Sequence, residues 1–392
     1  MMSEWYEVPL RELVGYISKG IAPVYSEEKT QTTIRVLNQK CNRDFKISYD
    51  DSKLHETQKK KVPIERYVRP YDVLINSTGA GTAGRIAQID EVPFATTIDG
   101  HMILIRTNGK VTQKFLGYAL KAHQWEISQL DEGSTGQTEL NRERLLDEIM
   151  IRYPVSLDEQ KQSVSILSAL DEKIAINRAI NDNLLQQAQA LYDNAFPYSP
   201  DDELPKGWRL GTVGDVVVIH DSKRIPLSGA ERDKMTQRTY PYYGAASLMD
   251  YVDDYIFDGN YLLLGEDGTV IDAVGFPILQ YVWGKFWVNN HAHILTGAQG
   301  FEVETLLLLF KRTPVKSIVT GAVQPKISQA NLRSVPVVIP PAEALAAFNA
   351  TIMPMFDQIR QNDEQNRALA AMRDALLPKL MSGEIDVSTV PL

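Results

Sequence analysis

The chain is short of cysteine and of long apolar runs. Its 392 residues include one cysteine, Cys41. A single thiol excludes an internal disulfide and a thiolate metal cluster, and it fits a reducing cytoplasm. The sequence has no apolar run of about 18 residues, which a membrane span needs, and no basic N-terminus before an apolar segment. It therefore predicts a cytoplasmic protein without a membrane span or a secretion signal.

Recognised catalytic motifs are missing as well. The chain has no P-loop G-x-x-x-x-G-K-[ST], no dinucleotide-binding fingerprint leading from a strand into a helix, no G-x-S-x-G and no H-E-x-x-H. It also lacks the N/D-P-P-Y/F tetrapeptide that amino-methylating enzymes place beside a flipped base. These absences favour a non-catalytic binding protein.

A long helix is predicted in the middle of the chain, over residues 157–197. No glycine interrupts the run before Pro197, and a period close to 3.5 residues indicates a coiled coil. The seam residues are Leu167, Leu170, Ile174, Asn177, Asn181, Leu184, Ala188, Leu191 and Ala195. At roughly 1.5 Å per residue the helix would be about 60 Å long, more than one globular domain needs.

A second copy of this seam lies near the C-terminus, 185 residues later. Asn177 and Asn181 are matched by Asn362 and Asn366 at the same two seam positions. A buried seam asparagine costs stability and is best explained as a register device. We therefore expect the two helices to pair with each other. The alternative is two unrelated amphipathic helices, each packed on its own domain.

The repeat extends beyond the helices. LNRERLLDEIMIRYP (140–154) resembles ISQANLRSVPVVIPP (327–341), and the preceding loops align Gln137 with Gln324. An internal two-fold repeat follows. The predicted order is a first domain (1–156), the central helix (157–197), a second domain (198–341) and a C-terminal helical segment (342–392).

Each domain shows short strand signals. In the first domain these are residues 32–37, 73–75, 85–89 and 102–106, and residues 115–130 are predicted to be a helix. A Gly/Ser/Thr turn, INSTGAGTAGRIA, joins two of the strands and could bring backbone amides close to a partner. The fold class is therefore α+β.

The net charge of −9 argues against nucleic acid at first sight, but the charge is uneven. Residues 29–69 hold eleven Lys/Arg and five Asp/Glu, whereas residues 157–203 hold three and nine. Phosphate binding depends on the local patch, which belongs here to the domains. The alternative is an ordinary solvated surface.

Two groups could suggest an active site in the second domain. His291 and His293 could share one face of a strand as metal ligands, but the first domain matches them with His101 alone. Glu266 and Asp267 could form a carboxylate pair, yet the matching turn has no acid. We expect no metal and no catalytic residue.

The chain resembles the DNA specificity subunit of type I restriction–modification systems over nearly its whole length. The resemblance rests on the repeated order of domain and helix and on SALDEKIAINRAINDNLLQQAQALYDNAF and FDQIRQNDEQNRALAAMRDALLPKLMSGEID. LLPKLMSGEI (376–385) is among the more specific pieces.

The resemblance implies a role for each part. Each domain would be a target-recognition domain that reads one half of a bipartite double-stranded DNA sequence. The helices would form an antiparallel coiled coil that sets the half-site spacing and docks two methyltransferase subunits. S-adenosylmethionine would bind those subunits, so this chain would need no cofactor, and a motor-nuclease subunit can join the complex.

Base and phosphate contacts need cationic, amide and hydroxyl side chains. In the first domain we predict DNA contacts from Arg35, Lys40, Arg43, Lys46, Asn76, Ser77, Thr78 and Gln137. In the second we predict them from Lys223, Arg224, Arg238, Tyr243, Gln324 and Lys326. The two glutamines could instead hydrogen-bond their own loops.

Two competing hypotheses remain open. A metal-dependent nuclease or hydrolase would use Glu266, Asp267 and His291, and Asp267→Asn would abolish its cleavage of DNA. A coiled-coil adaptor would show no salt-dependent DNA binding, even with its protein partners present.

Overall fold

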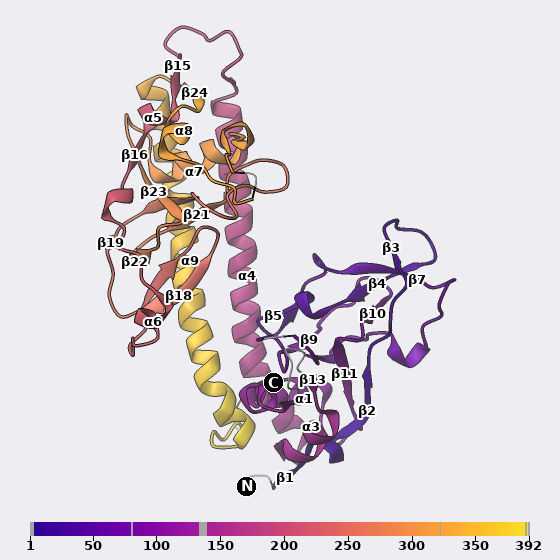
Figure 1. The fold of residues 1–392 in the computed structure, drawn as a ribbon. Coiled ribbons are helices and arrows are strands. Elements are labelled where there is room, and N and C mark those ends of the chain that lie inside the picture. Colours follow the sequence, from indigo (N-terminus) through magenta and orange to yellow (C-terminus); the bar gives the residue numbers. More distant parts are fainter. Residues whose placement is uncertain (1–3, 80, 133–138, 322, 389, 391–392) are drawn as a thin grey trace. The chain divides into compact units, whose positions relative to one another are not determined.

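The computed structural model describes residues 4–79, 81–132, 139–321, 323–388 and 390 (Figure 1). The chain divides into two compact units. Unit 1 holds residues 1–174 and 367–392, and unit 2 holds residues 175–366. The two longest helices, α4 (Leu157–Ala195) and α9 (Ala342–Ser382), each contribute one part to each unit. Among the described helices, none is long and apolar enough to cross a membrane.

Unit 1 is built on two four-stranded sheets. The first is antiparallel, with the order β2 (Val14–Lys19), β11 (Met102–Thr107), β8 (Val73–Asn76) and β9 (Ile86–Gln88). The second has the order β10 (Thr96–Ile98), β4 (Thr33–Leu37), β7 (Lys53–Glu56) and β3 (Tyr25–Ser26). β4 and β10 run parallel, and the other pairs run antiparallel.

Smaller elements close unit 1. β1 (Trp5–Pro9) pairs with β14 (Met150–Pro154), β5 (Asn42–Arg43) with β6 (Lys46–Ile47), and β12 (Asp131–Glu132) with β13 (Glu139–Leu140). The helices are α1 (Gln113–Ala122), α2 (Gln124–Ser128) and α3 (Arg142–Glu148). The predicted helix 115–130 is therefore two helices, because the chain leaves helical geometry at His123.

Unit 2 repeats the first sheet strand for strand. Its order is β16 (Val217–Ile219), β23 (Ala292–Gly297), β20 (Tyr261–Gly265) and β21 (Leu279–Val282). The second sheet differs at its ends, with β18 (Leu248–Val252), β17 (Tyr240–Tyr243), β22 (Lys285–Val288) and β19 (Phe257–Asp258). β17 and β22 run parallel, as β4 and β10 do.

The remaining elements of unit 2 follow the plan of unit 1. β15 (Arg209–Thr212) pairs with β24 (Pro336–Ile339), as β1 pairs with β14. The helices are α5 (Val213–Val216), α6 (Gly229–Arg232), α7 (Val303–Lys311) and α8 (Gln329–Arg333). The internal repeat inferred from the sequence is thus present in the strand order.

The long helices pack together in antiparallel fashion within each unit. In unit 2, Asn177 Nδ2 donates to Asn366 Oδ1 (3.0 Å) and Asn362 Nδ2 donates to Asn181 Oδ1 (2.8 Å). In unit 1, Arg373 Nη1 donates to Asp171 Oδ1 (2.7 Å). Along these contacts the residue number increases in α4 while it decreases in α9, so the helices form the expected antiparallel pair. α9 ends at Ser382, and the next residue, Gly383, has a φ of +76°, the left-handed conformation common after a helix C-terminus.

Each unit has a main core that joins strands to long helices. The core of unit 1 includes Ile75, Ile103, Phe115, Leu167 and Leu380. The core of unit 2 includes Leu264, Leu295, Leu306, Tyr192 and Ile352. Each globular domain therefore shares an apolar core with its own part of the helix pair.

Candidate nucleic-acid interface

Three loops of the first domain meet at the turn that follows β8. Asn42 Nδ2 donates to Asn76 Oδ1 (3.1 Å), and Asn76 Nδ2 donates to the carbonyl of Gln39 (3.2 Å). The amide of Leu140 donates to the carbonyl of Ser77 (2.8 Å). These buried contacts therefore hold together the segment after β4, the start of the Gly/Ser/Thr turn and Leu140 just before α3.

The structure places the predicted contacts of this domain at different depths. Lys40 and Arg43 are exposed, and Lys46, Thr78 and Arg35 are half-buried. Thr78 Oγ1 lies 2.8 Å from His101 Nδ1, so its hydroxyl already has a partner. Gln137 lies outside the described residues.

Asn76 and Ser77 are corrections. Both side chains are fully buried, and Asn76 is hydrogen-bonded inside the domain. Asn76 is the last residue of β8, and Ser77 follows it before the turn reaches the surface. Neither side chain is accessible to a duplex in this structure, which does not support their prediction as DNA contacts.

An aromatic side chain that the sequence did not single out lies on the basic region. Phe94 is 43% exposed, and Lys29 Nζ and the Arg35 guanidinium lie 5.4 and 5.6 Å from its ring centre. Arg35 therefore belongs to a basic and aromatic patch on β4. An exposed phenylalanine beside two cations suits contact with sugar or base surfaces. A lone Phe in a loop gave no pattern from which to predict this.

The second domain gathers its charged residues at the matching turn, after β20. Arg224 Nη1 lies 2.6 Å from Glu266 Oε2, and Lys326 Nζ lies 3.4 Å from Glu266 Oε1. Gln324 donates to the Asp267 carboxylate. The structure therefore brings Arg224, Gln324 and Lys326 together, but it also pairs each with an acid.

The other contacts predicted in this domain lie in different settings. Lys223 is exposed beside Arg224. Arg238, on the segment before β17, pairs with Asp250 of β18 (3.3 Å). Tyr243 is half-buried and meets Phe286 edge to face, so its ring belongs mainly to a small apolar core.

His293 lies beneath the Glu266 turn and is fully buried. Its Nδ1 is 2.6 Å from Asp221 Oδ2, and its Nε2 is 2.8 Å from the carbonyl of Ile327. A carbonyl can only accept, so Nε2 donates to Ile327, while Nδ1 faces the Asp221 carboxylate. Burial tends to raise the pKa of Asp221, but the His293 hydrogen bond and charge outweigh it and lower this pKa.

This arrangement bears on metal binding. Asp221, Glu266 and His293 offer ligand atoms within 4.8 Å of one another, in a site buried enough to hold an ion. In this structure both ring nitrogens of His293 are engaged in hydrogen bonds, one with Asp221 and one with the carbonyl of Ile327. His291 lies before β23, with Nδ1 3.8 Å from Asp267. Through the carbonyl of Ile327, His293 therefore helps to hold the loop that carries Gln324 and Lys326.

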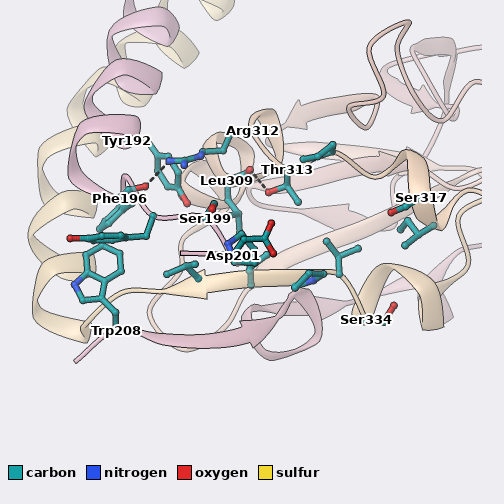
Figure 2. Close-up of a pocket in the computed structure, with 18 residues that line it drawn as sticks. Tyr192, Phe196, Ser199, Asp201, Trp208, Leu309, Arg312, Thr313, Ser317 and Ser334 are labelled. Carbon is teal, nitrogen blue, oxygen red and sulfur yellow. Dashed lines mark hydrogen bonds between the residues drawn. The ribbon is translucent and has the colours of Figure 1, made fainter. Parts of the chain in front are cut away.

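A cavity of about 400 Å³ lies elsewhere in unit 2, where α4 ends (Figure 2). Tyr192, Phe196, Trp208 and Arg312 are among the residues that line it. Arg312 Nη1 donates to the carbonyl of Phe196 (2.5 Å), which satisfies a C-terminal carbonyl of α4. None of the predicted DNA contacts within the described residues lines this cavity, which belongs to the end of α4.

Comparisons with known proteins identify the family. The model of the type I restriction modification DNA specificity domain matches residues 2–186 and again 205–369. The type I restriction enzyme MjaIX specificity subunit of Methanocaldococcus jannaschii is 26% identical over 74% of this chain and 73% of its own length. A putative type I restriction enzyme specificity subunit of Haemophilus influenzae is 30% identical over 33% of this chain and 32% of its own length.

A solved structure shares the fold. The type I restriction–modification S subunit of M. genitalium superposes with a TM-score of 0.52 at 17% identity, over 97% of this chain and 96% of that one. Since the family model matches most of the chain in two copies, this protein belongs to the DNA specificity subunits of type I restriction–modification systems.

Proposed function

We propose that the chain is the non-catalytic subunit that determines which DNA sequence a type I methyltransferase and endonuclease complex recognises. Each domain reads one half of a bipartite target in double-stranded DNA. The paired helices set the distance between the half-sites and dock two methyltransferase subunits. S-adenosylmethionine binds those subunits, a motor-nuclease subunit can join them, and this chain carries no cofactor of its own.

One observation carries the proposal: the same recognition domain occurs twice, and each copy shares a core with the antiparallel helix pair. Two recognition domains on one helix pair suit a DNA target that consists of two half-sites. The basic surface of residues 29–69 supplies contacts to the DNA phosphates. Much of the acidic charge lies on the central helix, outside this basic surface.

Specific residues follow in each domain. In the first domain, we propose DNA contacts by Arg35, Lys40, Arg43, Lys46, Thr78 and Gln137. In the second, we propose them by Lys223, Arg224, Arg238, Tyr243, Gln324 and Lys326. Because Arg224, Gln324 and Lys326 are paired with acids, DNA must exchange those partners, which makes the second domain the more selective against a wrong sequence. The asparagines Asn177, Asn181, Asn362 and Asn366 fix the helix register.

A genome-wide map of methylated adenine tests the proposal. Deletion of this gene should remove one bipartite methylated motif, and restoration of the gene should return it. Exchange of residues 1–156 for the first domain of another family member should change one half of the motif only. Retention of both halves after the exchange contradicts the assignment of one half-site to each domain.

A further inference from the structure

A buried group of tyrosine, carboxylate and arginine fastens the first domain to the helices. Tyr118 of α1 donates to Asp171 Oδ2 of α4 (2.8 Å), and Arg373 Nη1 of α9 donates to Asp171 Oδ1 (2.7 Å). The side chains of Asp171 and Arg373 are 15% and 16% exposed. One carboxylate thus ties the domain to both long helices at once.

The second domain has its own group of the same composition. Tyr281 of β21 donates to Glu304 Oε1 of α7 (2.5 Å), and Arg360 Nη1 of α9 donates to the same oxygen (2.8 Å). Asn260 Nδ2 adds a third donor at 3.2 Å. The side chains of Glu304 and Arg360 are 2% and 15% exposed.

The two groups occupy non-equivalent positions of the internal repeat. Asp171 lies on a long helix in unit 1, whereas Glu304 lies on the domain helix α7 in unit 2. Shifted by the 185 residues that relate the two helices, Asp171 corresponds to Phe356. The same chemistry therefore arises from different positions, and both arginines come from α9.

Stability alone does not explain these groups. Apolar cores already join each domain to the helices, and buried ion pairs are often no more stabilising than apolar residues of similar size. Charged hydrogen bonds do supply direction, because an arginine and a carboxylate meet in few geometries. Burial and the neighbouring carboxylate raise the pKa of both tyrosines, so each hydroxyl stays a donor.

We propose that Arg373 and Arg360 are positioning residues, which fix the angle of each recognition domain on the helix pair and so restrict the DNA spacer to one length. The inference rests on the proposed function, since it needs a bipartite target with a defined spacer. Neither residue need touch DNA. The arginines act through Asp171 with Tyr118 and through Glu304 with Tyr281.

The test replaces each group and measures spacer tolerance. Tyr118→Phe, Asp171→Leu and Arg373→Met together remove the first group without leaving a buried polar atom unpaired. Glu304→Gln with Arg360→Met weakens the second while the amide still accepts from Tyr281. Each full chain is assembled with its methyltransferase subunits. Methylation is then compared on targets with the cognate spacer and with one base pair more or fewer.

We expect the half-site sequences to stay the same. Methylation of targets with altered spacers, relative to the cognate target, should rise roughly tenfold. A tenfold change corresponds to a free-energy difference of about 1.4 kcal/mol, the size of one modest interaction. Arg373→Lys keeps the charge but loses the guanidinium fork, so methylation of the altered spacers should rise less than in the triple variant. This single variant still tests the inference if the triple variant does not fold. The control is Asp158→Leu with Lys161→Met, which removes an exposed ion pair of α4 and should leave the spacer unchanged.

The outcomes separate this inference from the proposed function. If the wild-type complex methylates no bipartite target, the proposed function fails. If the wild type requires one spacer and the folded variants of both groups require the same one, the positioning role is overturned. A change in the recognised bases also overturns it, because it would place the group in base reading.

Discussion

Lys121 shows how a single residue can oppose the fold that contains it. Its ammonium lies 4.4 Å from the centre of the Phe45 ring, and burial, with the nearby Arg373 charge, lowers its pKa to about 8. A lysine with a lowered pKa destabilises the folded state wherever it must be charged. This penalty is complete below pH 8 and disappears as the pH rises towards the unfolded value near 10.5.

We therefore predict that Lys121→Met stabilises the protein at pH 7. Methionine keeps much of the volume and removes the cost of burying a charge, while the loss of the contact with Phe45 offsets about 0.5–1 kcal/mol. The melting temperature should rise at pH 7, and the difference from wild type should shrink between pH 8 and pH 10.5. Thermal unfolding at several pH values measures it. The exposed Lys40→Met is the control, and a difference independent of pH contradicts the explanation.

Single residues are also where prediction from sequence was weakest. Residue type identified Asn76 and Ser77 as DNA contacts, but depth decides whether a side chain meets a partner, and depth depends on how the turn after β8 folds. Likewise, two histidines at alternate positions resemble metal ligands. Only the folded chain shows that the carbonyl of Ile327, 34 residues away in the sequence, hydrogen-bonds one ring nitrogen of His293.

Elements were easier to predict where their periodicity is long. The seam of the central helix and its copy predicted α4 and α9 closely, because about four heptads of apolar spacing leave little alternative. The four strands predicted in the first domain were located to within a few residues, as β4, β8, β9 and β11, but others such as β2, β7 and β10 were not predicted. The expected helix 115–130 was broken at His123, since a local turn of this kind has no repeating signal.

The seam asparagines give a prediction at this scale. Asn177 is fully buried, and its amide donates to Asn366 Oδ1 and to Gln365 Oε1 (2.7 Å). Asn177→Leu alone leaves the Asn366 oxygen without this donor, whereas Asn177→Leu with Asn366→Leu removes both polar groups. We expect the double variant to be more stable than the sum of the single effects by on the order of 1 kcal/mol.

Urea unfolding of the four proteins of this double-mutant cycle measures the coupling. The exposed Asn183 and Gln361 on the same helices, changed to leucine in the same way, should show none. Additive effects for Asn177 and Asn366 would mean that their hydrogen bond contributes no coupling free energy to the stability of the helix pair.

At the scale of the whole chain, the repeat made the architecture predictable. Matched segments such as 140–154 and 327–341 implied two domains of one plan, and the strand orders of the first sheets agree. The second sheets differ, because β3 extends one beyond β7 and β19 extends the other beyond β22. Such additions at sheet edges do not change the pairing of α4 with α9. The surface of a domain can therefore vary while the helix pair stays the same.

Because the domains and the helix pair can vary independently, the effect of lengthening α4 and α9 can be predicted. Seven residues inserted in α4 after Ile174, and seven in α9 after Asn366, add one heptad to facing positions at the unit boundary. Two turns extend the helices by roughly 10 Å and return nearly the same face to the seam. At about 3.4 Å per base pair, the spacer of the methylated motif should grow by about three base pairs, with both half-sites unchanged. A methylation map of cells carrying the variant measures this. Insertion in α4 alone is the control, and it should abolish methylation, because the seam residues of α4 would no longer face those of α9. An unchanged spacer in the double insertion would mean that contacts outside the helices set the distance.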